Sequence, residues 1–182
     1  NAAPEAPDSV LLERIDDRGV ATLTLNRPKA RNALSVALMS ALIEATERIG
    51  EDPAVKVVVL DANGPAFCAG HDLKELRAHP ERDFYEKVFG MVSRLMLGFA
   101  DLPKPLIAKV HGMATAAGCQ MVATADLAIC AEEAKFATPG VDIGLFCSTP
   151  MVALSRAVGR KKAMEMLLTG RAIDAAEAEA AG

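Results

Sequence analysis

The stretch KPLIAKVHGMATAAGCQMVATADLAIC, Lys104 to Cys130, shows most clearly how this chain folds. Its short apolar run from Leu106 to Val110 follows two prolines and predicts a buried strand. Small residues from Gly112 to Gly118 then predict a loop that leads into a helix. A second short strand is expected from Leu127 to Cys130. A strand, a loop, a helix and a further strand in this order predict an α/β unit.

The same order of elements precedes this stretch. Val55 to Leu60 is a continuous β-branched run, which predicts a strand buried on both faces, and a loop from Asn63 to Gly70 follows it. Helices are expected over Asp72 to Ala78 and from Arg82 to about Phe99. Ser35 is the expected N-cap of an earlier helix. Strands separated by helical crossovers place the chain in the α/β class.

Both ends of the chain carry further structural signals. The runs Val10 to Ile15 and Val20 to Leu25 flank a turn and predict a β-hairpin. Near the other end, Thr149 is the expected N-cap of a helix, and Asp174 with Glu177 resembles a capping box.

Length, composition and charge limit the possible functions. The 182 residues are 51% hydrophobic, so one sizeable core can form without a second domain. We expect a domain over residues 9–182 after a loose tail at residues 1–8, which lacks the pattern of an export signal. A net charge of −4 argues against nucleic acid or an anionic membrane as partner. The apolar runs are much shorter than the roughly 20 residues of a membrane span.

Four cysteines lie far apart in the sequence, at Cys68, Cys119, Cys130 and Cys147. They form no CxxC pair and have no histidine at metal-ligand spacing, so we expect neither disulfides nor a metal site. Each is expected to be a small, buried, apolar side chain. This usage points to a reducing intracellular compartment, either the cytoplasm or the mitochondrion.

Two loops carry the predicted chemistry. GPAFCAGHDLKEL runs from Gly64 to Leu76, and HGMATAAGCQMVATAD runs from His111 to Asp126. Each follows a predicted strand, consists largely of small residues and leads into a helix, where backbone amides point outward unpaired. Such loops sometimes serve only tight packing. Side by side, however, they can direct two N–H groups at one oxygen, as in an oxyanion hole.

A family resemblance favours the second alternative. Five segments resemble, in the same order, segments of the crotonase (enoyl-CoA hydratase/isomerase) superfamily: LNRPKARNAL from Leu25, AFCAGHDLKEL from Ala66, the stretch from Lys104 to Cys130, AKFATPGVDIGL from Ala134 and LLTGRAIDAAEAEAAG from Leu167. The resemblance implies a spiral of ββα units whose C-terminal helical trimerisation part is missing or truncated here. It also implies an acyl-CoA ligand in fatty acid metabolism, no cofactor beyond the coenzyme A of the substrate, and a homotrimer or hexamer.

The resemblance also assigns roles to individual residues. It places the two oxyanion-hole amides on His71 and Ala117. It places seven residues beside coenzyme A, the first three near its phosphates: Arg27, Lys29, Ala30, Ala69, Asp72, Leu73 and Lys74. Without that context, the lysines and arginine would be interpreted as ordinary solvated surface.

Two positions depart from the hydratase pattern. Where hydratases of the superfamily have catalytic glutamates, this chain has Gln120 and Gly140. Hydration needs one group to activate water and another to deliver a proton, so ordinary two-glutamate hydration is not expected. The His71 imidazole is the best alternative acid or base, although we expect only its amide to act. Asp142 is expected to face away, while Cys147 and Ser148 are expected to pack or cap a helix.

Two functions therefore remain open. The first is an enoyl-CoA hydratase/isomerase-type enzyme with weakened or altered activity, which we favour. The second is a crotonase relative that binds acyl-CoA without turning it over. A dinucleotide-binding domain is excluded because no GxGxxG lies at a strand-to-helix turn with an acidic residue downstream.

Overall fold

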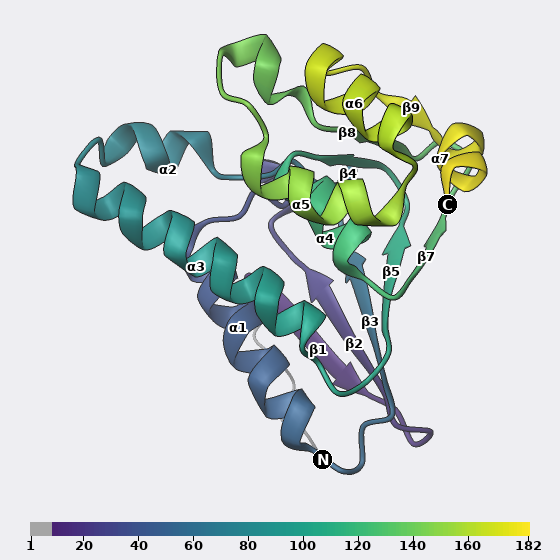
Figure 1. Ribbon diagram of the computed structural model, residues 1–182. Coiled ribbons are helices and arrows are strands. Elements are labelled where there is room, and N and C mark those ends of the chain that lie inside the picture. The colour runs from purple at the N-terminus through teal and green to yellow at the C-terminus, as the bar shows by residue number, and fades with distance from the viewer. Residues whose placement is uncertain (1–8) are drawn as a thin grey trace.

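The larger of two sheets forms the base of the molecule in a computed structural model that describes residues 9–182 (Figure 1). The expected tail at residues 1–8 lies outside the described residues. In spatial order the strands are β1 (Leu11–Ile15), β2 (Val20–Leu25), β3 (Val57–Ala62), β5 (Leu106–Val110) and β7 (Leu127–Cys130). β1 and β2 form the expected antiparallel hairpin, and the other neighbours pair in parallel.

A second sheet of four short strands was not expected from the sequence. It contains β4 (Ala66–Cys68), β6 (Met113–Thr115), β8 (Lys135–Ala137) and β9 (Ile173–Asp174). β4 and β6 lie inside the two segments that we predicted to be loops, so those predictions were wrong in part. Strands of three residues carry too little alternation to be recognised, and only their pairing with one another defines them. β4, β6 and β8 are parallel, and β9 is antiparallel to β8.

The order of strands confirms a spiral of ββα units. In each of the pairs β3–β4, β5–β6 and β7–β8, the first strand joins the large sheet and the second joins the small one. The helical elements are η1 (Pro28–Ala30), α1 (Val36–Glu51), α2 (Leu73–Ala78), α3 (Arg82–Ala100), α4 (Ala117–Thr124), η2 (Pro139–Ile143), α5 (Ser148–Ala157), α6 (Arg160–Thr169) and α7 (Ala175–Ala181). α1 packs against β1 and β2 of the large sheet, and α3 runs beside α1 and packs against it (Figure 1).

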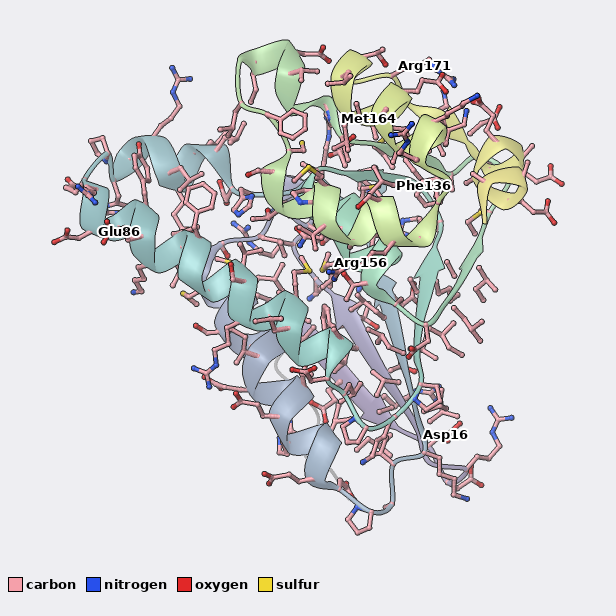
Figure 2. The ribbon with its side chains drawn as sticks, in the orientation of Figure 1. Asp16, Glu86, Phe136, Arg156, Met164 and Arg171 are labelled. Atoms are coloured by element: carbon pink, nitrogen blue, oxygen red, sulfur yellow. The ribbon has the colours of Figure 1, made fainter. Side chains whose placement is uncertain are left out.

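Local sequence signals explain several of these elements. The Ser35 side chain accepts a hydrogen bond from the Leu38 amide and caps α1, as expected. The Asp174 and Glu177 side chains form the expected capping box at the start of α7. Arg171 forms ion pairs with Glu165 and Glu177 on the outer side of the C-terminal helices (Figure 2). These pairs join α6 to α7 across β9.

Three other local predictions were wrong. β3 begins two residues later than expected and alternates between buried and half-buried residues, because the helices cover mainly one face of its sheet. α5 begins at Ser148 with Cys147 as its N-cap, so Thr149 does not cap it. Cys130 is exposed because β7 is an edge strand, whereas Cys68, Cys119 and Cys147 are buried as expected. No helix within residues 9–182 combines the length and the apolar character needed to cross a bilayer.

Candidate functional site

The two small-residue loops meet at Gly70. Gly70 has a φ of 86°, which favours glycine, and it packs directly on the second loop. A Cβ atom placed on Gly70 would lie 3.0 Å from the Ala116 Cβ and 3.5 Å from the Ala117 nitrogen. Gly118 is equally restricted, because a Cβ there would overlap the Cys68 carbonyl oxygen of β4. Small residues therefore bring the backbone after β4 against the start of α4.

This approach leaves two backbone amides free at the junction. Leu34 forms a bridge to the first loop, in which its amide donates to the Gly70 oxygen and its oxygen accepts from the Asp72 amide. The His71 amide between them has no acceptor among residues 9–182, nor has the Ala117 amide at the first residue of α4. The N-terminus of α4 adds a partial positive charge beside them. The junction can therefore bind an oxygen that carries negative charge.

Ala116 holds the second amide in place through an unusual backbone conformation. Its φ of 51° and ψ of −119° lie outside the regions that alanine normally occupies. Its amide donates to the Ala137 oxygen at 2.9 Å, and its oxygen accepts from the Gln120 amide at 2.9 Å. Sequence reasoning missed this residue, because an alanine gives no signal of a positive φ.

Gln120 and Gly140, where the resemblance implies glutamates in hydratases, belong to segments that meet the second loop. Gln120 lies one turn along α4 from Ala117 and is only 7% exposed. Gly140 lies in η2, three residues after Ala137 of β8, which pairs with the second loop. A Cβ on Gly140 would overlap the Leu145 oxygen and would lie 2.8 Å from the Cys147 sulfur. The connection between η2 and α5 therefore fills the space that a side chain at position 140 would need.

His71 extends its side chain toward α3. Its ring centroid lies 5.3 Å from that of Phe89, and its Nε2 atom is buried without a hydrogen-bond partner. Burial lowers the pKa of His71 below 6.5, which favours a neutral ring at pH 7. Because the His71 imidazole is uncharged, the partial positive charge at the junction comes mainly from the two free backbone amides.

The other candidate acids and nucleophiles have different surroundings. The Asp142 carboxylate lies close to Gly170 at the end of α6, where a glycine Cβ would be 2.9 Å from its oxygens. Burial raises the pKa of the Cys147 thiol, which opposes a nucleophilic role. Ser148 is exposed at the first residue of α5. Within residues 9–182, no group of three His, Cys, Asp or Glu residues could hold a metal ion.

The structure brings together the segments expected beside coenzyme A. The loop after β2 contacts the segment before α2, where the Ala69 amide donates to the Arg31 oxygen at 3.0 Å. Arg27 already has internal partners, because its guanidinium binds the Asp72 carboxylate at 2.9 Å and the Ala33 oxygen. Although burial opposes ionisation, the Arg27 hydrogen bond and two α2 amides lower the pKa of Asp72. Arg27 therefore joins the two segments.

The remaining residues of that set are accessible to differing degrees. Lys29, Leu73 and Lys74 are exposed, and Ala30 and Ala69 are half-buried. Neither lysine forms an ion pair within the part of the chain that the structure describes. Sequence reasoning missed Asn32, which is fully buried and donates through its amide to the Asn63 and Ala66 oxygens.

Comparison with known proteins identifies the family. The model of the enoyl-CoA hydratase/isomerase family matches residues 16–182. The chain belongs to the enoyl-CoA hydratase/isomerase family. This confirms the resemblance to the crotonase superfamily.

Individual members of the family resemble the chain closely. It is 46% identical over 97% of its length to a rat protein named enoyl-CoA hydratase domain-containing protein 3, mitochondrial, and it spans 59% of that relative. The crystal structure of an enoyl-CoA hydratase from Mycobacterium smegmatis matches with a TM-score of 0.93 and 58% identity, over 95% of this chain and 67% of that one. The structure of human enoyl-CoA hydratase domain-containing protein 3 matches with a TM-score of 0.91 and 46% identity, over 95% and 68%.

Proposed function

We propose that this chain binds an acyl-CoA thioester and polarises its carbonyl group between the His71 and Ala117 amides. The observation that carries the proposal is the pair of free amides at the junction of two loops, beside the N-terminus of α4. A thioester oxygen gains negative charge when an enolate forms, and preorganised donors stabilise that charge. Lys29 and Lys74, both exposed, are the proposed contacts for the coenzyme A phosphates.

The proposed enzyme hydrates enoyl thioesters slowly or carries out an altered reaction. Gln120 cannot exchange a proton near neutral pH, and Gly140 has no side chain. Loss of a general acid or base typically reduces a rate by about 10²- to 10⁴-fold. The same two residues support the second candidate, a relative that binds acyl-CoA without turnover.

Infrared spectroscopy of a carbonyl-labelled acyl-CoA tests the proposed polarisation. Hydrogen bonds from the two amides should lower the carbonyl stretching frequency of the bound ligand. Ala117→Pro removes one N–H and should reverse part of that shift, whereas Ala117→Ser keeps the N–H and should not. Circular dichroism and binding of free coenzyme A would verify that the proline variant is folded. An unshifted carbonyl in the complex would rule out the proposal.

Turnover separates the two candidate functions. Loss of crotonyl-CoA absorbance measures hydration, and calorimetry with acetoacetyl-CoA measures binding. Binding with slow turnover that increases in Gln120→Glu would support a weakened enzyme. Binding without turnover in either protein would favour the non-catalytic relative. Rapid hydration by the unmodified chain would refute the expected loss of two-glutamate chemistry.

The setting of this function is also a proposal. The vertebrate relatives are named mitochondrial, which supports the mitochondrial alternative of the expected compartments, and imaging of a tagged chain in cells would test it. A homotrimer or hexamer of the full-length protein remains the proposed assembly, and light scattering would measure it.

A further inference from the structure

A series of hydrogen bonds links the Arg27 guanidinium to the His71 amide. The Arg27 Nη1 atom donates to the Ala33 oxygen. The Leu34 amide, which belongs to the same peptide group as that oxygen, donates to the Gly70 oxygen at 2.7 Å. The Gly70 oxygen in turn shares a peptide group with the His71 amide, which has no acceptor among residues 9–182. The hydrogen-bond series therefore runs from a cation through two peptide groups to a free N–H.

Peptide geometry sets the direction in which the His71 N–H points. A trans peptide group is planar, so its C=O and its N–H point in opposite directions, and residues 9–182 contain no cis peptide bond. Because the Leu34 amide holds the Gly70 oxygen, the His71 N–H points away from Leu34. The Leu34 oxygen also accepts from the Asp72 amide at 3.1 Å. The backbone is thus held on both sides of His71.

The Arg27 side chain that starts the series is itself fixed within the protein. Its Nη2 atom donates to the Asp72 carboxylate at 2.9 Å, and the side chain is 23% exposed. At its other end, the Arg27 amide donates to the Asn32 side-chain oxygen at 2.8 Å. A planar guanidinium with partners on both Nη atoms has little freedom to turn toward a ligand.

The series also strengthens the last donor. A hydrogen bond to a peptide oxygen polarises the peptide group, and bonds in a chain strengthen one another by perhaps about 10–30% each. The Ser35 amide donates to the same Ala33 oxygen at 3.0 Å and polarises it in the same direction. Ala33 is 8% exposed and Leu34 is 1% exposed, so little water screens the charge along this path.

The two amides of the junction differ in what else supports them. The Ala117 amide begins α4, whose dipole adds partial positive charge. The His71 amide precedes α2, a helix of six residues. The Asp72 carboxylate already accepts from the Lys74 and Glu75 amides at the start of α2. The positive charge that supports the His71 donor is therefore that of the guanidinium.

We infer that Arg27 is a positioning residue, which orients the His71 N–H and strengthens it as a donor through the hydrogen-bond series. The inference rests on the proposed function, since this donor matters when a thioester oxygen binds at the junction. It also replaces the phosphate contact that the resemblance implies for Arg27, because both Nη atoms already have partners inside the protein. Lys29 and Lys74 remain the proposed contacts for the phosphates.

Nuclear magnetic resonance of the unliganded protein tests the series without any acyl-CoA. Gly70–His71 is the only Gly–His pair in the sequence, so ¹³C-carbonyl glycine and ¹⁵N-histidine together label this peptide group alone. Arg27→Met should move its carbonyl and amide signals toward those of a weaker hydrogen bond. Arg94→Met is the matched control, because Arg94 pairs with Glu47 at 2.6 Å between α3 and α1. It should leave the signals in place, and unmoved signals in Arg27→Met would overturn the inference.

Infrared spectroscopy of bound, carbonyl-labelled acetoacetyl-CoA tests the effect on the ligand. Arg27→Met should lose about 10–30% of the carbonyl shift or more. Free coenzyme A lacks the thioester carbonyl, so its affinity should fall less than that of acetoacetyl-CoA. An unchanged carbonyl shift with equal losses of affinity for the two ligands would mean that Arg27 contacts coenzyme A itself, and the inference would be wrong.

Two further variants separate the series from the ion pair and from misfolding. Asp72→Asn removes the ion pair, but asparagine also caps helices and Arg27 keeps its bond to the Ala33 oxygen, so the carbonyl shift should persist. A loss as large as that in Arg27→Met would show that Arg27 only ties the two segments together. Arg27→Gln keeps a donor without the charge and should show a smaller loss in the same direction. It carries the test if Arg27→Met does not fold, and an unchanged shift there would equally refute the inference.

The inference and the proposed function fail in different ways. A carbonyl shift in the unmodified protein that no Arg27 variant changes, with unmoved resonances, would reject only the role of Arg27. Resonances that move in Arg27→Met, together with an unshifted carbonyl in the unmodified complex, would support the series and reject the proposed function.

Discussion

Replacing Ala116 with glycine should stabilise the protein, although an alanine-to-glycine change inside the following helix α4 should destabilise it. Ala116 has a φ of 51° and a ψ of −119°, which a Cβ atom disfavours and glycine adopts readily. A residue held in such a region costs about 1–3 kcal/mol. The greater freedom of glycine in the unfolded chain offsets about 0.5–1 kcal/mol of the relief. The expected net gain is therefore between about 0 and 2.5 kcal/mol.

Urea denaturation and thermal unfolding would measure this gain. For a chain of this length, each kcal/mol should raise the melting temperature by about 2–4 °C. Ala123→Gly is the matched control, because Ala123 lies inside α4, where glycine should cost about 1 kcal/mol. The two substitutions should thus change stability in opposite directions.

Ligand binding completes this test. The Ala117 amide is present in both variants, so acetoacetyl-CoA should still bind to Ala116→Gly. A less rigid backbone before that amide should weaken the carbonyl shift rather than abolish it. If Ala116→Gly is as destabilising as Ala123→Gly, Ala116 is not strained and the reasoning about how the amide is held is wrong.

Three further outcomes follow from the site. Gly140→Ala should destabilise the protein by about 1–3 kcal/mol in urea denaturation, because the added Cβ would displace the connection to α5. Gly90→Ala is the control and should not destabilise the protein, because a Cβ there meets open space. Equal effects of the two substitutions would contradict the packing at Gly140. Burial lowers the pKa of His71 in the folded protein below its ordinary value of 6.5. As the pH falls below 6.5, the unfolded chain therefore takes up this proton before the folded protein does. The free energy of unfolding should fall over this range until the pH reaches the folded pKa. His71→Ala should flatten that pH dependence yet leave acyl-CoA affinity nearly unchanged, and a roughly 100-fold loss of turnover with unchanged affinity would instead assign catalysis to the imidazole. Burial opposes ionisation of Asp72, but Arg27 and two backbone amides lower its pKa in the folded protein. Its contribution to stability should be present above about pH 4 and be lost as the pH falls through the lower folded pKa. Asp72→Asn should remove this acid dependence in denaturation experiments, and an unchanged dependence would argue against the ion pair.

The expectation for restored hydration also changes with the structure. From the sequence alone, placing glutamates at Gln120 and Gly140 together should raise hydration of crotonyl-CoA. A glutamate at position 140 would overlap the connection to α5, so we expect Gly140→Glu to destabilise the fold rather than to restore catalysis. Gln120→Glu by itself is therefore the informative variant, with crotonyl-CoA absorbance as the measurement.

The sequence by itself determined the family, the α/β class, the opening hairpin, and the helix cap and the capping box whose signals are local. Ser35 and the pair Asp174 and Glu177 lie within one helical turn of the amides they bind, so their residue types suffice to predict them. Periodicity and order along the chain likewise gave most strands of the large sheet. The candidate amide positions His71 and Ala117 came from the family resemblance rather than from residue chemistry.

Only the tertiary structure decided which groups meet at the junction. β4 and β6 exist as strands because they pair with each other, and this pairing places Gly70 against Ala116. The strain at Ala116 and the filled space at Gly140 depend on atoms contributed by distant segments. An alanine or a glycine has the same local propensity whether or not such neighbours are present. Their roles are therefore set by packing between distant segments, which no pattern within one segment records.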